Sequence, residues 1–266
     1  MRIFFMAGYR SSVRAHKRFV NALCQRGCQV DAYDMPGHGA HPYGTRGHVY
    51  VLRTCREIIA ALRSRTPTVI VGHSLGAVML VVATALLRAV APRAHRRIAV
   101  LHLVNPAFHT GHNVPWYIKF TGLAVGTLLP RLPLGTMDVN CISDHSRVRR
   151  YIREAVAAGE VYTGPMTAAT ALRIYLTGKL ALALLPLVGV QVHLHVGVHD
   201  GVARMPASWY LRACPRVRVH TYDGMHDTLD RPIPAARIVL AVVWDAHRGS
   251  SADEVDATGN IAPEEG

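Results

Sequence analysis

One stretch of the chain, Val69–Leu87, places a serine in a setting suited to nucleophilic chemistry. An apolar β-branched run ends in the motif GHSLG at Gly72–Gly76, and an apolar helical pattern follows. This order of strand, tight turn and helix is what a G-x-S-x-G nucleophile elbow requires. We expect strained backbone at Ser74, and we expect Gly72 and Gly76 to let the strand and helix approach closely. The Ser74 hydroxyl would then lie beside the first N–H groups of a helix, where negative charge is stabilised.

Two further residues complete a set that could activate this serine. A serine hydroxyl is a weak nucleophile until a histidine removes its proton and an acidic group orients that histidine. Asp200 comes just after a predicted strand at Gln191–Val196, and His226 comes just after the next one, at Val217–Tyr222. Nucleophile, acid and base thus follow one another in a chain order known for triads on doubly wound sheets. We therefore predict a catalytic triad of Ser74, Asp200 and His226.

Both the serine motif and the choice of acid have alternatives. A glycine-rich turn between a strand and a helix would show the same five-residue pattern without a catalytic role. Asp223, Asp227 and Asp230 lie nearer to His226 in the sequence than Asp200 does. We expect these three to be solvated or helix-capping residues on the histidine's own loop, because the acid in this chain order follows a separate strand.

The pattern around these residues predicts an α/β fold with a doubly wound, mostly parallel sheet. Six apolar, β-branched runs predict its buried strands: Arg2–Met6, Gln29–Tyr33, Thr68–Val71, Ile98–Val104, Gln191–Val196 and Val217–Tyr222. Helical patterns separate the first four strands and follow the last one: Val13–Cys24, His48–Arg63, Leu75–Val90 and Ala235–His247.

About ninety residues without strand alternation separate the fourth and fifth predicted strands. They contain helical patterns at Val114–Thr127, Ser146–Ala158 and Met166–Leu185. An insertion there lies over the carboxyl ends of the strands, where ligands bind in such sheets, so we predict an apolar helical lid. The predicted division is a core at 1–107 and 189–248, a lid at 108–188 and a disordered acidic tail at 249–266.

The charge of the chain is unevenly distributed. The formal net charge is +13, yet residues 249–266 hold five acidic residues and no basic one, which leaves 30 basic against 12 acidic residues elsewhere. Such a surface attracts nucleic acid or anionic lipid headgroups. Because no nucleic-acid-binding motif is present, we predict no nucleic-acid partner and favour peripheral contact with a membrane surface. No signal peptide or spanning segment is recognised, so we expect a cytoplasmic protein.

The cysteines and histidines of this chain are more typical of structural roles than of metal binding. The five cysteines are an odd, scattered set, which indicates reduced thiols, and no second pair joins Cys24 and Cys28 in a zinc pattern. His193 and His195 would share one face of a strand, but buried strand histidines more often pack and form hydrogen bonds than bind metal. We therefore predict no metal site and no cofactor.

The chain resembles the α/β-hydrolase superfamily, and within it the monoacylglycerol lipase or lysophospholipase-like branch. Gly8-Tyr9 corresponds to the family's oxyanion loop, although Ala7 stands where the family usually has histidine. Asp34–Gly39 (DMPGHG) and Thr45–Val49 (TRGHV) are similar to two later family segments, and Ser143–Tyr151 is similar to the lid of monoglyceride lipases. The family's usual antiparallel hairpin before the first strand is not seen, so we expect a sheet without those two strands.

This resemblance implies a serine hydrolase that cleaves carboxylic esters of lipids through an acyl-enzyme, without a cofactor. Monoacylglycerol or lysophospholipid is the implied substrate, and the backbone N–H groups of Tyr9 and Leu75 are the implied oxyanion donors. A thioesterase, a small-ester esterase or an acyltransferase would use the same scaffold. A non-catalytic ligand-binding relative is the alternative from another class. The sequence predicts neither the acyl chain length nor the oligomeric state.

Overall fold

The structure is a computed structural model that describes residues 2–64, 69–109, 116–136, 138–203, 212 and 214–258. Along 116–120, at 139 and along 249–258 it describes the backbone alone. Thr68 and Val114, which the predicted elements include, lie outside the described residues.

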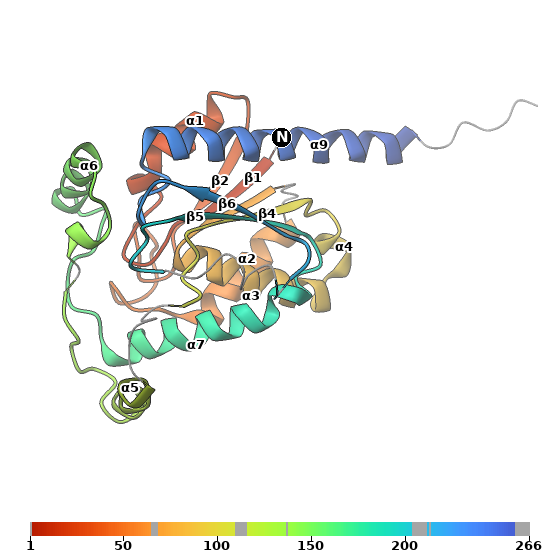
Figure 1. Ribbon diagram of the computed structural model, residues 1–266. Helices are drawn as coiled ribbons and strands as arrows, with labels where there is room; N and C mark the ends of the chain where they lie inside the picture. Colours follow the sequence, from red (N-terminus) through yellow and green to blue (C-terminus); the bar gives the residue numbers. More distant parts are fainter. Residues whose placement is uncertain are drawn as a thin grey trace, which may run out of the picture.

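A six-stranded sheet forms the centre of the molecule (Figure 1). Its strands are β1 Arg2–Met6, β2 Gln29–Tyr33, β3 Val69–His73, β4 Val100–Val104, β5 Gln191–Gly197 and β6 Val217–Tyr222. The spatial order is β2-β1-β3-β4-β5-β6, and every neighbouring pair is parallel. The order runs outward in two directions from β1 and β3, so the prediction of a doubly wound parallel sheet is confirmed.

Helices cover both faces of the sheet because its central strands are apolar on both sides. Side chains alternate between the faces of a strand, so Phe4 and Met6 of β1 pack in one core cluster and Ile3 and Phe5 in another. The helices on the first face are α2 Val51–Ser64 and α3 Leu75–Val90, followed by the short α4 Pro92–His95. Those on the second face are α1 Lys17–Cys24, preceded by the 3₁₀ turn Arg14–His16, and α9 Pro232–Thr258 (Figure 1).

The segment between β4 and β5 is helical, as the sequence predicts. It contains α5 Trp116–Leu128, α6 Ser146–Ala157 and α7 Ala168–Leu184, with 3₁₀ turns at Val139–Cys141 and Leu185–Leu187. Helix α7 packs against α3 (Figure 1). Gly178 lets α7 lie against the segment that follows β4, since a Cβ there would lie 2.8 Å from the carbonyl oxygen of Phe108. The stretch Ala168–Leu187 is long and apolar enough to cross a membrane, and 44% of its apolar window is buried within the protein.

Several boundaries differ from the prediction. Helix α1 begins at Lys17 rather than Val13, and α9 begins at Pro232 rather than Ala235. Helix α2 begins at Val51 rather than His48, because the residues before it form a loop in which the Tyr50 hydroxyl accepts a hydrogen bond from the backbone N–H of Thr45. Helix α9 passes the predicted end at His247 and enters the segment 249–266 that composition predicts to be disordered. A formed helix propagates through Ser, Ala, Asp and Glu residues at little cost. Residues 259–266 lie outside the described residues.

Candidate active site

Ser74 connects β3 directly to α3 in a strained turn. Its backbone has φ 53° and ψ −120°, a region that L residues rarely adopt. Close packing leaves no room for side chains on either side of this turn. A Cβ on Gly72 would lie 2.6 Å from Cα of Ala77, and one on Gly76 would lie 2.7 Å from the carbonyl oxygen of Met6. Glycine at both positions therefore lets α3 begin directly against β1 and β3.

The side chains of Ser74, His226 and Asp200 meet at the carboxyl end of the sheet. Nε2 of His226 lies 2.8 Å from Oγ of Ser74, and Nδ1 of His226 lies 2.8 Å from Oδ2 of Asp200. All three residues are buried, with exposed fractions of 8%, 6% and 0% for the serine, histidine and aspartate. The imidazole thus joins a hydroxyl and a carboxylate that lie far apart in the sequence.

Asp200 is held in its ionised form by the groups around it. Burial alone would raise the pKa of this carboxyl, but the neighbouring His226 and two backbone donors lower the pKa below its usual value. The backbone N–H groups of Val202 and Ala203 donate to Oδ1 at 2.8 and 3.0 Å. Because Oδ1 is occupied in this way, Oδ2 faces the imidazole.

Each of the three rival aspartates has a partner other than the imidazole of His226. Asp227 is buried, and its carboxylate accepts hydrogen bonds from Nε of Arg231 at 2.8 and 3.0 Å. Oδ1 of Asp230 lies 3.6 Å from Nδ1 of His16, and the exposed Asp223 lies 3.4 Å from His199. Proximity in the sequence therefore does not identify the histidine's partner in the fold.

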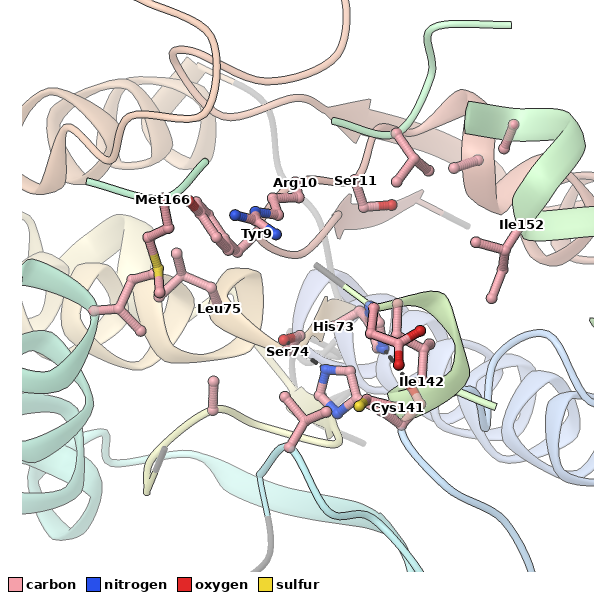
Figure 2. A pocket seen from close by; sticks show the side chains of 18 of the residues that line it. Tyr9, Arg10, Ser11, His73, Ser74, Leu75, Cys141, Ile142, Ile152 and Met166 are labelled. Carbon is pink, nitrogen blue, oxygen red and sulfur yellow. Dashed lines mark hydrogen bonds between the residues drawn. The ribbon is translucent and has the colours of Figure 1, made fainter. Parts of the chain in front are cut away.

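Tyr9 and Leu75, the residues that the resemblance implies as oxyanion donors, flank Ser74. Leu75 is the first residue of α3, where backbone N–H groups have no partner within the helix. Tyr9 follows Gly8, whose missing Cβ would lie 2.8 Å from Cβ of Ser74. Both residues line the same pocket as Ser74 (Figure 2).

Asn105 is a buried polar residue at this site that sequence reasoning did not single out. Its amide donates to the carbonyl oxygen of Met225 at 3.0 Å, and its Oδ1 accepts from the N–H of Gly197 at 2.9 Å. It thereby ties the end of β4 to the segments that carry Asp200 and His226. Its φ of 43° is one that asparagine tolerates better than most residues. The signal that could have identified it is a polar residue directly after a buried central strand.

The triad opens onto a largely apolar pocket of about 410 Å³. That volume is in the range typical of small-molecule sites. The core supplies one part of the wall and the segment between β4 and β5 supplies the rest. Side chains from both are labelled in Figure 2: Tyr9, Ser74 and Leu75 from the core, and Ile142, Ile152 and Met166 from the inserted segment.

Comparison with known proteins agrees with this geometry. Residues 1–230 match the family described as serine aminopeptidase, S33, which covers most of the chain and all three triad positions. The chain belongs to this family of α/β-hydrolases. The resemblance found in the sequence is thereby confirmed at the level of the fold and the hydrolase family. No curated protein sequence matches this hydrolase.

Solved structures share the fold of this hydrolase at low sequence identity. A monoacylglycerol lipase from Paleococcus ferrophilus is 20% identical, with a TM-score of 0.75 over 92% of this chain and 94% of that one. A soluble variant of the Saccharomyces cerevisiae monoglyceride lipase is 12% identical, with a TM-score of 0.73 over 93% and 86%. A thioesterase domain from the curacin biosynthetic pathway is 17% identical, with a TM-score of 0.62 over 90% of each chain.

Proposed function

We propose that this hydrolase cleaves carboxylic esters of lipids, with monoacylglycerol or lysophospholipid as substrate, through an acyl-enzyme on Ser74. The observation that carries the proposal is the hydrogen-bonded series Ser74–His226–Asp200 at the mouth of an apolar pocket. A pocket of this kind accepts an acyl chain and excludes water from the reacting atoms.

In the first half-reaction, Oγ of Ser74 attacks the ester carbonyl while Nε2 of His226 takes its proton. Asp200 keeps the other ring nitrogen protonated, so that Nε2 is free to accept, and it stabilises the imidazolium that forms. The imidazolium then gives its proton to the leaving alcohol. Water, activated by the same histidine, attacks the acyl-enzyme and releases the fatty acid.

The negative charge of the tetrahedral intermediate requires donors that are already in place. We assign this role to the backbone N–H groups of Tyr9 and Leu75, which flank Ser74. Loss of one such donor commonly costs about 3 kcal/mol of barrier in serine enzymes. The first turn of α3 adds the favourable field of a helix N-terminus.

The proposed lipid specificity depends on the inserted segment. Helices α6 and α7 and the segments beside them place Ile152, Ile174, Val161 and Met166 in the pocket wall, so we propose that residues 108–188 act as a lid. The similarity to two monoglyceride lipases supports the same substrate class. The basic body of the protein would draw it to anionic lipid surfaces, where such substrates reside.

A substrate panel tests this proposal. Purified protein is given a monoacylglycerol, a lysophospholipid, a long-chain acyl-CoA and an aminoacyl amide, and the released fatty acid or amine is quantified. We expect the highest kcat/KM on one of the two lipid esters, with no turnover in Ser74→Ala. Preference for acyl-CoA would favour a thioesterase, as in the curacin pathway domain, and preference for the amide would favour an aminopeptidase. Either result contradicts the proposed substrate class.

A further inference from the structure

A cluster of histidines lies on the sheet face that α9 covers, separate from the proposed active site. On β4 and β5, Leu101, Leu103 and Leu194 pack toward α3, so the alternate residues point to the opposite face. These alternate residues include His102, which is paired in register with His193, and His195, which is paired with His220 of β6. Four imidazoles, His102, His193, His195 and His220, thus gather on one face of β4, β5 and β6.

Three of these rings have the spacing of a metal site. His102, His193 and His195 are buried, and each offers one nitrogen such that the three nitrogens lie within 4.8 Å of one another. Helix α9 adds a carboxylate: Oδ2 of Asp245 lies 3.2 Å from Nε2 of His102 and 3.4 Å from Nδ1 of His193. With Zn–N bonds of 2.0–2.1 Å, a tetrahedral site has ligand atoms about 3.4 Å apart. The distances from Oδ2 of Asp245 to His102 and His193 agree with this value.

Nε2 of His195 lies 2.9 Å from Nδ1 of His102 in a hydrogen bond, so His195 is not free to bind an ion, and three other atoms of the cluster are the candidate ligands. Nε2 of His102, Nδ1 of His193 and Oδ2 of Asp245 are buried, and none of them makes a well-directed hydrogen bond within the described structure. Such groups carry a large desolvation cost unless an unseen partner satisfies them. These three atoms lie close together without forming hydrogen bonds to one another. This arrangement is expected when their lone pairs point to one shared ion.

The groups outside the cluster also fit a metal site. Metal-bound histidines usually have their second nitrogen held by a neighbouring polar group. Nδ1 of His102 lies 2.9 Å from Nε2 of His195, and Nε2 of His193 lies 3.0 Å from the side-chain amide of Gln191. Imidazoles with one carboxylate suit Zn²⁺ or Co²⁺, whereas Ca²⁺ and Mg²⁺ prefer oxygen ligands.

We propose that His102, His193 and Asp245 bind a transition-metal ion of the Zn²⁺ class that fastens α9 to β4 and β5, and that His195 supports the ring of His102 from outside the site. The sequence favoured packing roles for His193 and His195, because it does not show that β4 brings His102 beside them or that α9 brings Asp245. None of these residues is among those that line the pocket at Ser74, so we assign the ion a structural role. It does not depend on the proposed ester hydrolysis.

Cobalt binding to the full-length protein tests the site. Purified protein is treated with EDTA, freed of chelator and titrated with CoCl₂, because tetrahedral Co²⁺ gives intense visible d–d bands and hydrated Co²⁺ gives weak ones. We expect the bands to saturate at one equivalent and to disappear when Zn²⁺ is added. We also expect Zn²⁺ to raise the Tm of the metal-free protein.

Three variants locate the ion. Asp245→Asn is nearly isosteric and should weaken Co²⁺ binding at least tenfold, a loss typical of altered metal-site partners. His193→Gln should abolish the bands, and the control His199→Gln should leave them unchanged, since its side chain is 65% exposed and points away to Asp223. Circular dichroism shows whether each variant is folded. If His193→Gln does not fold, Co²⁺ binding by Asp245→Asn tests the site instead. Absence of tetrahedral bands in folded wild type, or equal binding by Asp245→Asn, would overturn the proposal.

Discussion

Replacing Asp200 with asparagine changes one atom of the proposed triad and leaves its shape intact. Oδ1 of Asp200 accepts two backbone N–H groups, so the amide oxygen of asparagine takes that position and the NH₂ group faces Nδ1 of His226. The imidazole must then accept at Nδ1 and carry its proton on Nε2. In that tautomer it cannot take a proton from Ser74. The same change in a serine protease costs about 10⁴ in kcat, which corresponds to about 5.5 kcal/mol of barrier.

The measurement is kcat/KM for a soluble chromogenic ester, normalised to the folded fraction. We expect Asp200→Asn to lose about 10⁴-fold while its circular dichroism spectrum stays that of wild type. The matched control is Asp227→Asn, which removes an equally buried carboxylate that is bound to Arg231 and not to His226. This control should destabilise the fold yet keep activity within about tenfold. The reasoning is refuted if folded Asp200→Asn stays within tenfold of wild type while Asp227→Asn is inactive.

Further substitutions test the positions around the triad. Gly76→Ala should lower the unfolding free energy by 2 kcal/mol or more, about the cost of overpacking, because its Cβ meets backbone of β1. Gly122→Ala has open space around it and should be neutral or stabilising in urea denaturation. Asn105→Ala removes two buried hydrogen bonds and should cost about 2 kcal/mol or more, with a lower kcat for ester hydrolysis; unchanged kcat would contradict its positioning role. His38 is buried, which lowers its pKa to about 4, while the unfolded chain takes up this proton near pH 6.5. Wild type should therefore lose about 3 kcal/mol more stability than His38→Gln as pH falls from 6.5 to 4, and parallel curves would argue against a neutral His38.

The sheet was predictable from sequence because its buried central strands are largely apolar and β-branched. Five of the six predicted strands start at or within one residue of the observed start, and β4 begins at Val100 instead of Ile98. Helix ends were less predictable, since periodicity identifies the buried face and not the last hydrogen-bonded turn. The start of α2 and the end of α9 both reflect this.

The meeting of Ser74, Asp200 and His226 could be anticipated from chain order, because the carboxyl ends of parallel strands share one edge of the sheet. Asn105 and the histidine cluster could not be anticipated in the same way. They depend on which strands are neighbours, on the register between them and on the helix that lies above. His102 becomes a neighbour of His193 only because β4 pairs with β5, across the whole inserted segment.

Labelling with a fluorophosphonate probe tests the central claim most directly, because the probe reacts only with a serine activated by a correctly placed base. We predict one adduct per folded molecule, mapped to Ser74 by peptide mass spectrometry, absent in Ser74→Ala and greatly slowed in His226→Ala. Folded wild-type protein that takes up no label, or takes it up on another serine, would contradict the claim that Ser74 is the nucleophile.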